Sequence, residues 1–542
     1  MAVWKDRWTG KTIGEALREA KDRYSAKTAM VFEKDTVTFD ELWDTSGLVA
    51  RGLLAFGVKK GDMVGIWMAG YVEWPYLYYA AARIGAIMVP VNTRYKAFEV
   101  EYVMNKSKAP FLVFRDEEDR GKSYYSILKE LAPEIGSTTQ PRFPSERLPN
   151  LKHVISISEK SYPGCSSFQE LLDAGAAISA DELARAEAGV QPGDTALLQF
   201  TSGTTALPKG ALLYQESMLR GSYYNNEGMG VPEGSFFFSP QPFYHVGGSI
   251  QVMLAPVVNG CAIVVQSYFD PTGALRLMEQ YQCTVTMGHQ PHWIEYLNHP
   301  DLKKRKLSIE RAEIFAPPDV RKRVYEEMNI KVITSPYALT ETHLGGCTCG
   351  PDDGLERLLT TVGKIEPGLE IAFRSPDDGS SLPAGEVGEI CFRGWCLMKG
   401  YHDDPKSTGD AIDREGWFRT GDLGMVGEDG YVRLVGRIKD MIRVGGENVA
   451  ASDVEGFLLS HKKIKQAAVV GFPDQRLGEV CAAFVELKRG AEATEAEIVS
   501  YCKSGLASFK VPRMIRFVTE WPLSGSGKIQ KFVLKDLLLS DG

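Results

Sequence analysis

Short runs of apolar residues alternate with amphipathic, helix-like segments along almost the whole sequence. Apolar runs of strand length occupy residues 63–68, 87–91 and 196–200. Two Thr-x-x-Glu patterns, at residues 12–15 and 38–41, are typical of the capping box that opens a helix. Because strands that alternate with helices tend to pair in parallel and to be covered by those helices, we expect an α/β fold with several layered sheets.

The length of the chain, 542 residues, exceeds what one hydrophobic core usually serves. The best boundary is the Gly-Arg-Ile-Lys-Asp segment at residues 436–440. Signals for a second unit follow it, namely Ser/Thr-x-x-Glu patterns at residues 452–455 and 494–497 and an apolar strand at residues 464–470. We predict a large N-terminal domain of layered sheets and helices, residues 1–436, and a small, mobile C-terminal α+β domain, residues 437–542.

Composition excludes several classes of protein. The chain is 44% hydrophobic and 24% charged, as ordinary globular proteins are. Its net charge of −8 argues against a nucleic-acid binder that acts by neutralising phosphates. An acidic protein can still bind an anionic ligand where lysines and backbone N–H groups gather locally.

The sequence favours a reduced, cytoplasmic protein with no membrane span. Its nine cysteines are scattered, and the closest pair, Cys347 and Cys349, has no further ligand at zinc spacing. The N-terminus is charged and lacks the apolar core of a signal peptide. The most apolar stretch, residues 250–265, is broken by Pro256 and Gly260 and is better explained as a buried helix that leads into a buried strand.

The most informative segment is an apolar strand that runs into a cluster of hydroxyl residues. Residues 201–205 read Thr-Ser-Gly-Thr-Thr, and Pro-Lys-Gly follows at residues 208–210. Such a loop can direct several N–H and hydroxyl groups at one anion, and Lys209 adds a mobile positive charge. The pattern does not fit a Walker A loop. Composition alone would equally allow a Ser/Thr-rich surface turn.

Six motifs together resemble those of the adenylate-forming enzymes, the family of acyl-CoA synthetases, peptide-synthetase adenylation domains and beetle luciferases. The hydroxyl loop, residues 201–210, resembles the signature loop of that family. The other five follow in the family's order and spacing: Tyr337-Ala-Leu-Thr-Glu341, Thr420-Gly-Asp422, Gly436-Arg-Ile-Lys-Asp440, Gly445-Gly-Glu-Asn448 and Ser526-Gly-Lys528. The resemblance covers residues 28–530, nearly the whole chain, and is nearest to stand-alone acid–CoA ligases.

The resemblance implies an ATP-dependent carboxylic acid–CoA ligase that uses Mg²⁺ and works through an acyl-adenylate. A carboxylate is a poor electrophile, because attack adds charge to an anion; joining it to AMP removes that charge and supplies a leaving group. The enzyme must hold a carboxylate and a triphosphate together, so cationic groups are essential. The expected partners are a small carboxylic acid, ATP and coenzyme A.

The resemblance also assigns roles in nucleotide binding. Phosphate contacts are implied for Thr201, Ser202, Gly203, Thr204, Thr205 and Lys209. Thr340 is expected at the α-phosphate, and Glu341 is expected to carry Mg²⁺. Tyr337 is expected to stack on adenine. Asp422 is expected to accept hydrogen bonds from the ribose hydroxyls, with the help of Arg437.

Further roles concern the acyl group and the small domain. Lys528 resembles the lysine that bridges the carboxylate and the α-phosphate oxygens and so promotes adenylation. Lys439 occupies the hinge position, and Gly446 is expected to let the pantetheine arm pass near the backbone after the domain rotates. His245 matches an aromatic or histidine gate beside the acyl pocket.

The sequence departs from the family pattern in two nucleotide motifs and in the acyl pocket. Ala206 in the hydroxyl loop and Ala338 after Tyr337 replace family glycines, and both are small. In the acyl pocket, Ile314 and Phe315 stand where the family usually has a Gly-Gly or Gly-Ser pair. The segment Met287-Gly-His-Gln-Pro-His-Trp293 lies where the family usually has apolar pocket residues. These changes favour an aromatic, alicyclic or polar (carnitine-like) acid over a plain long-chain fatty acid. His289 and His292 lack a third ligand for a metal.

Three alternatives stay open. In the first the acyl group passes to coenzyme A, and in the second it passes to the thiol of a separate carrier protein or to an amine. A non-catalytic, nucleotide-binding descendant of the fold is a third possibility, against which the presence of Thr340, Glu341, Asp422, Arg437 and Lys528 argues. The sequence does not decide the oligomeric state and is compatible with a homodimer.

Overall fold

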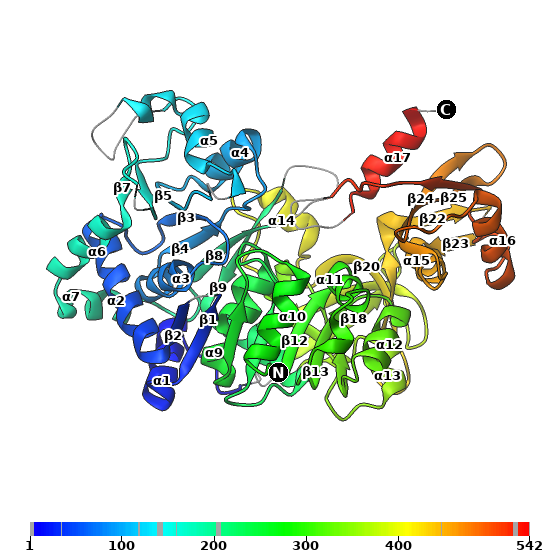
Figure 1. Cartoon of the computed structure of the whole chain (residues 1–542), viewed down its shortest axis with the longest axis horizontal. Coiled ribbons are helices and arrows are strands. Elements are labelled where there is room, and N and C mark those ends of the chain that lie inside the picture. The colour runs from blue at the N-terminus through cyan, green and yellow to red at the C-terminus, as the bar shows by residue number, and fades with distance from the viewer. Residues whose placement is uncertain are drawn as a thin grey trace.

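Two large β-sheets form the framework of the N-terminal part of the chain (Figure 1). The computed structural model describes residues 5–33, 35–117, 120–137, 145–158, 160–201, 208–445, 447–523 and 529–540. Within these ranges each sheet has seven strands. The strand order of the first sheet is β7 (Ser166–Ser167), β6 (His153–Ser156), β5 (Phe111–Phe114), β3 (Met63–Trp67), β4 (Ile87–Pro90), β8 (Thr195–Phe200) and β9 (Gly210–Tyr214). That of the second is β14 (Val332–Thr334), β13 (Arg311–Phe315), β12 (Val285–His289), β10 (Phe236–Ser239), β11 (Ala262–Val265), β1 (Thr28–Phe32) and β2 (Asp35–Thr38).

Both sheets are mainly parallel, as the alternating pattern predicts. In the first sheet β9 pairs antiparallel with β8, and in the second β2 pairs antiparallel with β1. The described neighbours β3–β4, β3–β5, β10–β12 and β12–β13 all pair in parallel. The three apolar runs singled out in the sequence are strands β3, β4 and β8.

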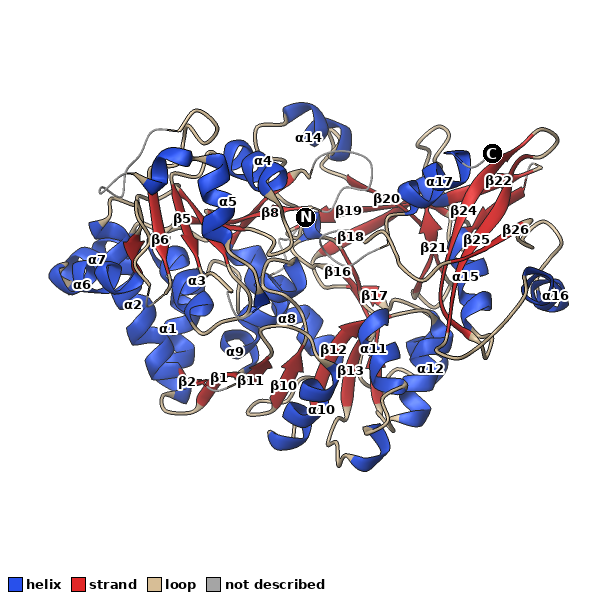
Figure 2. Cartoon of the chain, turned by 45° about the horizontal axis from the view of Figure 1, so that its top comes forward, coloured by secondary structure: helices blue, strands red, loops and turns tan. Residues whose placement is uncertain are grey.

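Helices lie between the two sheets and on their outer faces (Figure 2). The central layer contains α1 (Ile13–Tyr24), α2 (Phe39–Ala55), α3 (Glu73–Ile84), α8 (Gln215–Met229) and α9 (Met253–Asn259). Helices α6 (Phe168–Ala177) and α7 (Ala180–Ala188) pack against α2 and α3. The first sheet is covered outside by α4 (Ala97–Ser107) and α5 (Tyr124–Leu131), and the second by α10 (Pro271–Gln280), α11 (Gln290–Leu297), α12 (Pro318–Glu327) and α13 (Leu355–Thr360).

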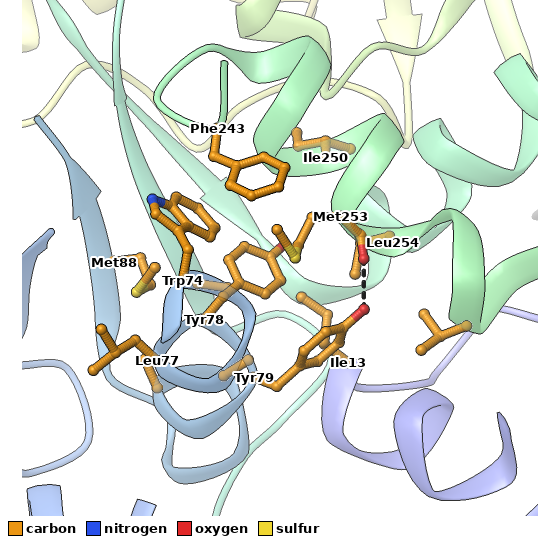
Figure 3. Packing of buried hydrophobic residues seen from close by; sticks show 14 of the residues in the cluster. Ile13, Trp74, Leu77, Tyr78, Tyr79, Met88, Phe243, Ile250, Met253 and Leu254 are labelled. Carbon is orange, nitrogen blue, oxygen red and sulfur yellow. Dashed lines mark hydrogen bonds between the residues drawn. The ribbon is translucent and has the colours of Figure 1, made fainter. Parts of the chain in front are cut away.

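Aromatic side chains fill the layer between the sheets (Figure 3). The rings of Trp74 and Tyr78, from α3, stack 5.5 Å apart, and the Trp74 ring lies 5.0 Å from that of Phe243. The Tyr79 hydroxyl donates a hydrogen bond of 2.5 Å to the carbonyl oxygen of Met253. This core therefore holds the segment between Phe243 and Met253, which carries His245, in a fixed position.

Smaller antiparallel sheets follow the two large ones. One consists of β15 (Tyr337–Ala338), β16 (Gly346–Thr348) and β17 (Lys364–Ile365). The next consists of β18 (Leu369–Arg374), β19 (Gly388–Gly394), β20 (Phe418–Val426) and β21 (Val432–Arg437), with α14 (Pro405–Ala411) between β19 and β20. Their apolar faces share one core. The predicted boundary at residues 436 and 437 falls at the end of β21 and stays a prediction.

The C-terminal residues form a separate mixed sheet with helices on both faces. Its strands are β22 (Met441–Val444), β23 (Glu447–Ala450), β24 (Ile464–Asp474), β25 (Gly478–Leu487) and β26 (Met514–Phe517). Helices α15 (Ala451–Leu459) and α16 (Glu495–Gly505) share one core with the sheet, and α17 (Lys531–Ser540) shares another. The fold class, a large α/β domain followed by a small α+β domain, is confirmed.

The predicted helix starts are confirmed in part. The hydroxyls of Thr12 and Thr38 accept hydrogen bonds from the backbone N–H groups three residues later, in reciprocal capping boxes. The prediction of a cap at Ser452 is wrong. Helix α15 begins at Ala451 with Ala450 as its N-cap, and the Ser452 hydroxyl donates instead to the carbonyl oxygen of Val435, 3.1 Å away.

Within the described ranges no helix combines the length and apolar character needed to cross a membrane. The stretch at residues 250–265 contains α9 followed by β11, both largely buried, as the interrupted apolar pattern predicts. All nine cysteines are free, and Cys347 and Cys349 are buried.

Candidate active site

Tyr337, Asp422 and Arg437 meet where three strands come together. Strands β20 and β21 pair antiparallel with Asp422 opposite Arg437. The Tyr337 hydroxyl donates a hydrogen bond of 2.7 Å to Asp422 Oδ2, and Arg437 Nε lies 2.9 Å from Asp422 Oδ1. Burial and the nearby Asp422 carboxylate raise the pKa of Tyr337, so its hydroxyl remains a donor. Three residues that the sequence assigned to one nucleoside site are thus joined through Asp422.

The Asp422 carboxylate keeps acceptor capacity toward a ligand. Only 4% of the residue is exposed. Among the described residues its Oδ1 atom has a charged neighbour in Arg437 but no hydrogen bond. A carboxylate accepts up to about four hydrogen bonds, so lone pairs remain for the hydroxyls of a ribose. The chemistry of this cluster therefore fits the expected nucleoside contact.

Thr340 and Glu341 lie in the short 3-10 helix η5 (Thr340–Thr342), directly after β15. The Glu341 carboxylate accepts a hydrogen bond of 2.8 Å from the hydroxyl of Tyr401. Its carbonyl oxygen accepts another, also 2.8 Å, from the backbone N–H of Met398. Glu341 is therefore fixed from both its backbone and its side chain.

Tyr401 is a site residue that the sequence analysis missed. Its ring lies 5.0 Å from the ammonium nitrogen of Lys209, and its hydroxyl contacts Glu341. Burial and the Glu341 charge raise the pKa of Tyr401. One aromatic side chain thus joins the expected phosphate lysine to the expected metal ligand. The sequence around Tyr401 does not predict this role, because its two partners, Glu341 and Lys209, are distant in the sequence.

Lys209 and Gly210, which follow the cluster of hydroxyl residues, line a cleft of about 510 Å³. The cleft is lined by Tyr102, Lys106, Lys209, Gly210, Tyr401, His402, Asp404 and Ser407. At the mouth of the loop the backbone N–H of Thr201 donates to the carbonyl oxygen of Lys209, 2.8 Å away. Ser202, Gly203, Thr204 and Thr205 lie outside the described residues, so their phosphate contacts stay predictions.

His343 fixes the turn that follows Glu341. It is fully buried, with φ of 51°, and its Nε2 accepts a 2.9 Å hydrogen bond from the backbone N–H of Tyr214. Its Nδ1 lies 2.7 Å from the carbonyl oxygen of Cys396. Burial lowers the pKa of His343 to about 3, so the ring is neutral at physiological pH. It is a structural link between η5 and β9.

His245 faces an aromatic wall formed by β12 and β13. Its ring lies 6.0 Å from that of His289, which in turn lies 5.0 Å from the ring of Phe315. His245 Nδ1 accepts a 3.3 Å hydrogen bond from the backbone N–H of Gly247, which orients the imidazole. The three rings come from the ends of different strands and the loop after β10, where open α/β sheets commonly bind ligands.

Other residues of the predicted acyl segment belong to the core or to an interface. Trp293 is fully buried among apolar residues, and its indole donates to the carbonyl oxygen of Gly288, 2.8 Å away. His292 packs against Phe269 with ring centroids 4.6 Å apart, and burial lowers its pKa to about 4. Gln290 donates to Gln466 of the small domain, 2.9 Å away. The described residues contain no cluster suited to a metal ion.

The residues assigned to the small domain are described unequally. Lys439 lies in the 3-10 helix η6 (Ile438–Asp440), between the last strand of the large domain and β22. Burial, reinforced by Arg437, lowers the pKa of Lys439. Gly446 and Lys528 lie outside the described residues. The roles of all three stay predictions.

Comparison with known proteins identifies the family. A family model described as "AMP-binding enzyme" matches residues 17–402. A second, described as "AMP-binding enzyme C-terminal domain", matches residues 453–528. The chain belongs to the AMP-binding enzyme family.

Similar members of the family are named as acyl-CoA synthetases or ligases. The putative acyl-CoA synthetase YngI of Bacillus subtilis is 35% identical over 531 residues, which cover 97% of this chain and 96% of the relative. The mitochondrial medium-chain acyl-CoA ligase ACSF2 of Danio rerio is 35% identical over 535 residues, 97% of this chain and 88% of the relative. Its human counterpart is 33% identical over 544 residues, 98% and 88% of the two chains.

Solved structures of the family share the fold along the whole chain. The anthranilate CoA ligase AuaEII, with anthranoyl-AMP, has a TM-score of 0.85 at 24% identity and covers 98% of both chains. ATP-bound MatB from Rhodopseudomonas palustris has a TM-score of 0.80 at 25% identity and covers 97% of this chain and 99% of its own. The amide bond synthetase McbA from Marinactinospora thermotolerans has a TM-score of 0.79 at 26% identity, with the same coverage.

This member of the AMP-binding enzyme family is an AMP-forming acid–CoA ligase that uses ATP, Mg²⁺ and coenzyme A. The residues present fit these groups. An acceptor-rich buried carboxylate is available for a ribose at Asp422, and an oxygen ligand, which Mg²⁺ prefers, is available at Glu341.

The Asp422 contact can be tested by an isosteric change. We expect Asp422→Asn to raise the KM for ATP by roughly 10- to 100-fold, because hydrogen bonds to a charged group are worth about 1.5–3 kcal/mol. The KM for the acid should change much less. Steady-state kinetics with ATP varied would measure this, with Asp429→Asn as the control, since Asp429 is near Arg357 and Tyr431 at a turn. An unchanged KM for ATP in Asp422→Asn would exclude the ribose contact.

Proposed function

We propose that the enzyme activates a carboxylic acid bearing a ring or a polar group and transfers the acyl group to coenzyme A after rotation of the small domain. The proposal is carried by one arrangement. Three groups of side chains lie at the ends of strands or in the turns after them. They are the nucleoside cluster around Asp422, the Glu341–Tyr401–Lys209 contact, and the aromatic wall of His245, His289 and Phe315.

In this proposal the chain's own residues hold the two anions in position. Asp422 and Arg437 orient the ribose, and Tyr337 provides the aromatic face for adenine. Lys209 and the hydroxyl loop hold the outer phosphates, while Thr340 contacts the α-phosphate. Glu341 would hold Mg²⁺, which when bound neutralises charge on the departing pyrophosphate. Tyr401 orients the Glu341 carboxylate and keeps Lys209 beside it.

The substrate class is inferred from the aromatic wall. Neighbouring rings of His245, His289 and Phe315 favour a flat acyl group, because aromatic pairs gain energy beyond simple burial, and the imidazoles can hydrogen-bond to a polar one. Phe315 stands where a smaller residue would leave room for a long chain. The relatives named as medium-chain ligases make a plain medium-chain acid the rival substrate.

The second half-reaction is assigned to the small domain. We infer that Lys439, in the short η6 segment, is the pivot, because a single turn of 3-10 helix joins β21 of the large domain to β22 of the small one. Lys528 acts in adenylation and withdraws afterwards, and Gly446 then approaches the pantetheine arm. The Gln290–Gln466 hydrogen bond must break and re-form during this cycle.

A panel of acids tests the substrate proposal. Benzoate, cyclohexanecarboxylate, carnitine, octanoate and palmitate would be compared by acid-dependent pyrophosphate release, and the thioester would be followed by mass with and without coenzyme A. We expect a ring-containing or polar acid to give the highest kcat/KM. Best efficiency with palmitate or octanoate would overturn the substrate class. Adenylation without any thioester would instead indicate a carrier-protein or amine acceptor, and no pyrophosphate release under any condition would indicate a non-catalytic protein.

A further inference from the structure

A buried carboxyl group on β13 has only one polar partner among the residues that the structure describes. Glu313 is fully buried, and Gln251 Nε2 donates a hydrogen bond of 2.8 Å to its Oε2. Within the described part of the chain its Oε1 accepts no hydrogen bond. Thr334, paired with Glu313 in the register of β13 and β14, also has a buried hydroxyl without a partner among these residues. Such groups reduce stability, so their presence calls for a ligand or another function.

Glu313 lies on the face of β13 that carries the acyl wall. Side chains alternate between the two faces of a strand. Ala312 and Ile314 pack in the core on the outer side of the second sheet, whereas Phe315 packs against the core between the sheets. Glu313 therefore shares the inner face with Phe315, two residues along, whose ring contacts His289. The orphan carboxyl oxygen is thus on the same face as the aromatic wall.

Gln251 comes from an unusual helix. Residues Gly247–Val252 form a π-helix, η3, a conformation that occurs often at functional sites. Ile250 points into the aromatic core (Figure 3), and the next side chain, Gln251, reaches Glu313 instead. In the same π-helix the hydroxyl of Ser249 donates to Gln199 Oε1, 3.2 Å away.

The π-helix therefore connects the two halves of the site. Gln199 lies on β8, two residues before Thr201 and the hydroxyl loop. Gln251 contacts β13, which ends at Phe315 in the acyl wall. His245 begins the segment, and its carbonyl oxygen accepts the backbone N–H groups of Gly248 and Ser249. Gln251 of the polar pair therefore lies in the helix that directly follows the expected gate residue, His245.

We propose that Glu313, with Gln251 and Thr334, forms a polar end of the acyl site, and that the natural acid carries a hydroxyl or amino group that hydrogen-bonds to the Glu313 carboxyl. This inference rests on the proposed function above and narrows its substrate class. Gln251 holds the carboxyl in place, and the Thr334 hydroxyl lies in register to complete the contact. When an acid without a hydroxyl or amino group binds, Glu313 Oε1 and the Thr334 hydroxyl gain no hydrogen bond, and Gln251 keeps the one it has to Glu313.

The protonation state of Glu313 decides which donor binds best. Burial raises the pKa of Glu313 to about 8, and the Gln251 hydrogen bond lowers it only in part. The free carboxyl is therefore largely protonated at neutral pH. Because Oε2 accepts from Gln251, the proton is on Oε1, which donates to the oxygen of a ligand hydroxyl, while that hydroxyl can donate to the second lone pair of Oε2. An ammonium group would favour the ionised carboxylate through charge pairing. The two donors are thus distinguishable in one panel.

Glu366 offers a matched control. It is also buried, and burial raises its pKa to about 8. Unlike Glu313, it accepts a 3.1 Å hydrogen bond from a backbone N–H, that of Gly346, and it is influenced by the positive charge of Arg220. It follows β17, a strand of the three-stranded sheet, whereas the aromatic wall belongs to the second seven-stranded sheet. Its Oε1, like that of Glu313, has no hydrogen-bond partner among the described residues. Glu366→Gln therefore removes a buried carboxyl group of the same kind without touching the proposed subsite.

The experiment compares parent acids with donor-bearing derivatives. Octanoate would be tested with its terminal hydroxyl and terminal amino derivatives, and benzoate with its para-hydroxyl and para-amino derivatives. We expect the wild type to favour at least one derivative by about tenfold or more in kcat/KM, since a site that accepts a substrate hydrogen bond rejects the analogue lacking it. In Glu313→Leu that ratio should fall to about one, while Glu366→Gln keeps the wild-type ratio.

Each outcome is decisive. Glu313→Gln, which keeps shape and one oxygen, should retain part of the preference, and thermal unfolding checks that every variant is folded. A wild type that favours the parent acids throughout, or a Glu313→Leu variant that keeps the preference, overturns this inference while leaving the ligase function intact. No acid-dependent pyrophosphate release with any acid would overturn the proposed function instead.

Discussion

Lys528→Ala is expected to lower the rate of adenylation by roughly 100- to 1,000-fold, the usual cost of losing one preorganised group that stabilises a charged transition state. The lysine is proposed to lie between the two anions, and its point charge matters most when the new bond forms. Acid-dependent ATP–pyrophosphate exchange would measure the loss. Thioester formation from a supplied acyl-adenylate should remain within about threefold of the wild type, because the lysine has no proposed role in that step.

Lys535→Ala is the control for this variant. Lys535 lies on α17 of the same domain and forms an ion pair of 3.0 Å with Glu479, partly exposed on both sides. An exposed pair contributes about 0–1 kcal/mol, so its loss should leave both half-reactions unchanged. If Lys528→Ala reduced both steps equally, the assignment of the lysine to adenylation would be wrong.

Glu341→Gln is expected to lower kcat by roughly 100-fold and to raise the Mg²⁺ concentration needed for half-maximal activity. The change preserves shape and removes the negative charge that would hold the metal. Calorimetric titration of Mg·ATP into the variant should show weaker binding, which gives a readout separate from turnover. The introduced side-chain amide still reaches the Tyr401 hydroxyl, so the local fold should persist.

Tyr401→Phe separates orientation from charge. It removes the 2.8 Å hydrogen bond to Glu341 but keeps the ring beside Lys209. Because this hydrogen bond orients the carboxylate and does not supply its charge, we expect kcat to fall by roughly tenfold, the low end of the about 1.5–3 kcal/mol that a hydrogen bond to a charged group contributes. That fall is smaller than the roughly 100-fold expected for Glu341→Gln. For the Glu341→Gln variant, an unchanged Mg²⁺ concentration at half-maximal activity would show that Glu341 is not a ligand of the metal.

Much of the fold followed from local patterns. The runs that became β3 and β4 were apolar throughout, and that of β8 was apolar except for Gln199, as strands buried on both faces are. Thr12 and Thr38 capped helices as expected, because both partners of a capping box lie within four residues. The predicted cap at Ser452 was wrong because its partner is not local: the hydroxyl donates to the carbonyl oxygen of Val435, in another segment.

The sequence predicted only those residues of the candidate site that belong to a recognisable motif. Tyr337, Asp422 and Arg437 were identified separately, and the pairing of β20 with β21 brings two of them together. Tyr401 and Gln251 could not be found, because their roles depend on contacts with residues 60 and 62 positions away in the sequence. Trp293 was assigned to the acyl segment but lies in the core, because sequence spacing does not reveal which face of α11 meets the core. The ring of His292, by contrast, lies 6.2 Å from that of His289 in the aromatic wall.

The assignments that stay predictions lie mainly in loops. The centre of the hydroxyl loop, Gly446 and Lys528 are outside the described residues, so their roles rest on the resemblance of their motifs. The structure contributes the fixed surroundings instead. Thr201 and Lys209 close the base of the loop, and η6 joins the two domains.

The link between Gln290 and Gln466 bears on how the enzyme could sense its substrate. Gln290 opens α11, directly after His289, while Gln466 lies on β24 of the small domain. A neutral hydrogen bond contributes about 0.5–1.5 kcal/mol, so thermal motion alone breaks it often. An acyl group that displaced His289 slightly would also shift Gln290, because the two residues are adjacent in the chain. Acid binding and the proposed rotation of the small domain would then be coupled through the side-chain amides of Gln290 and Gln466.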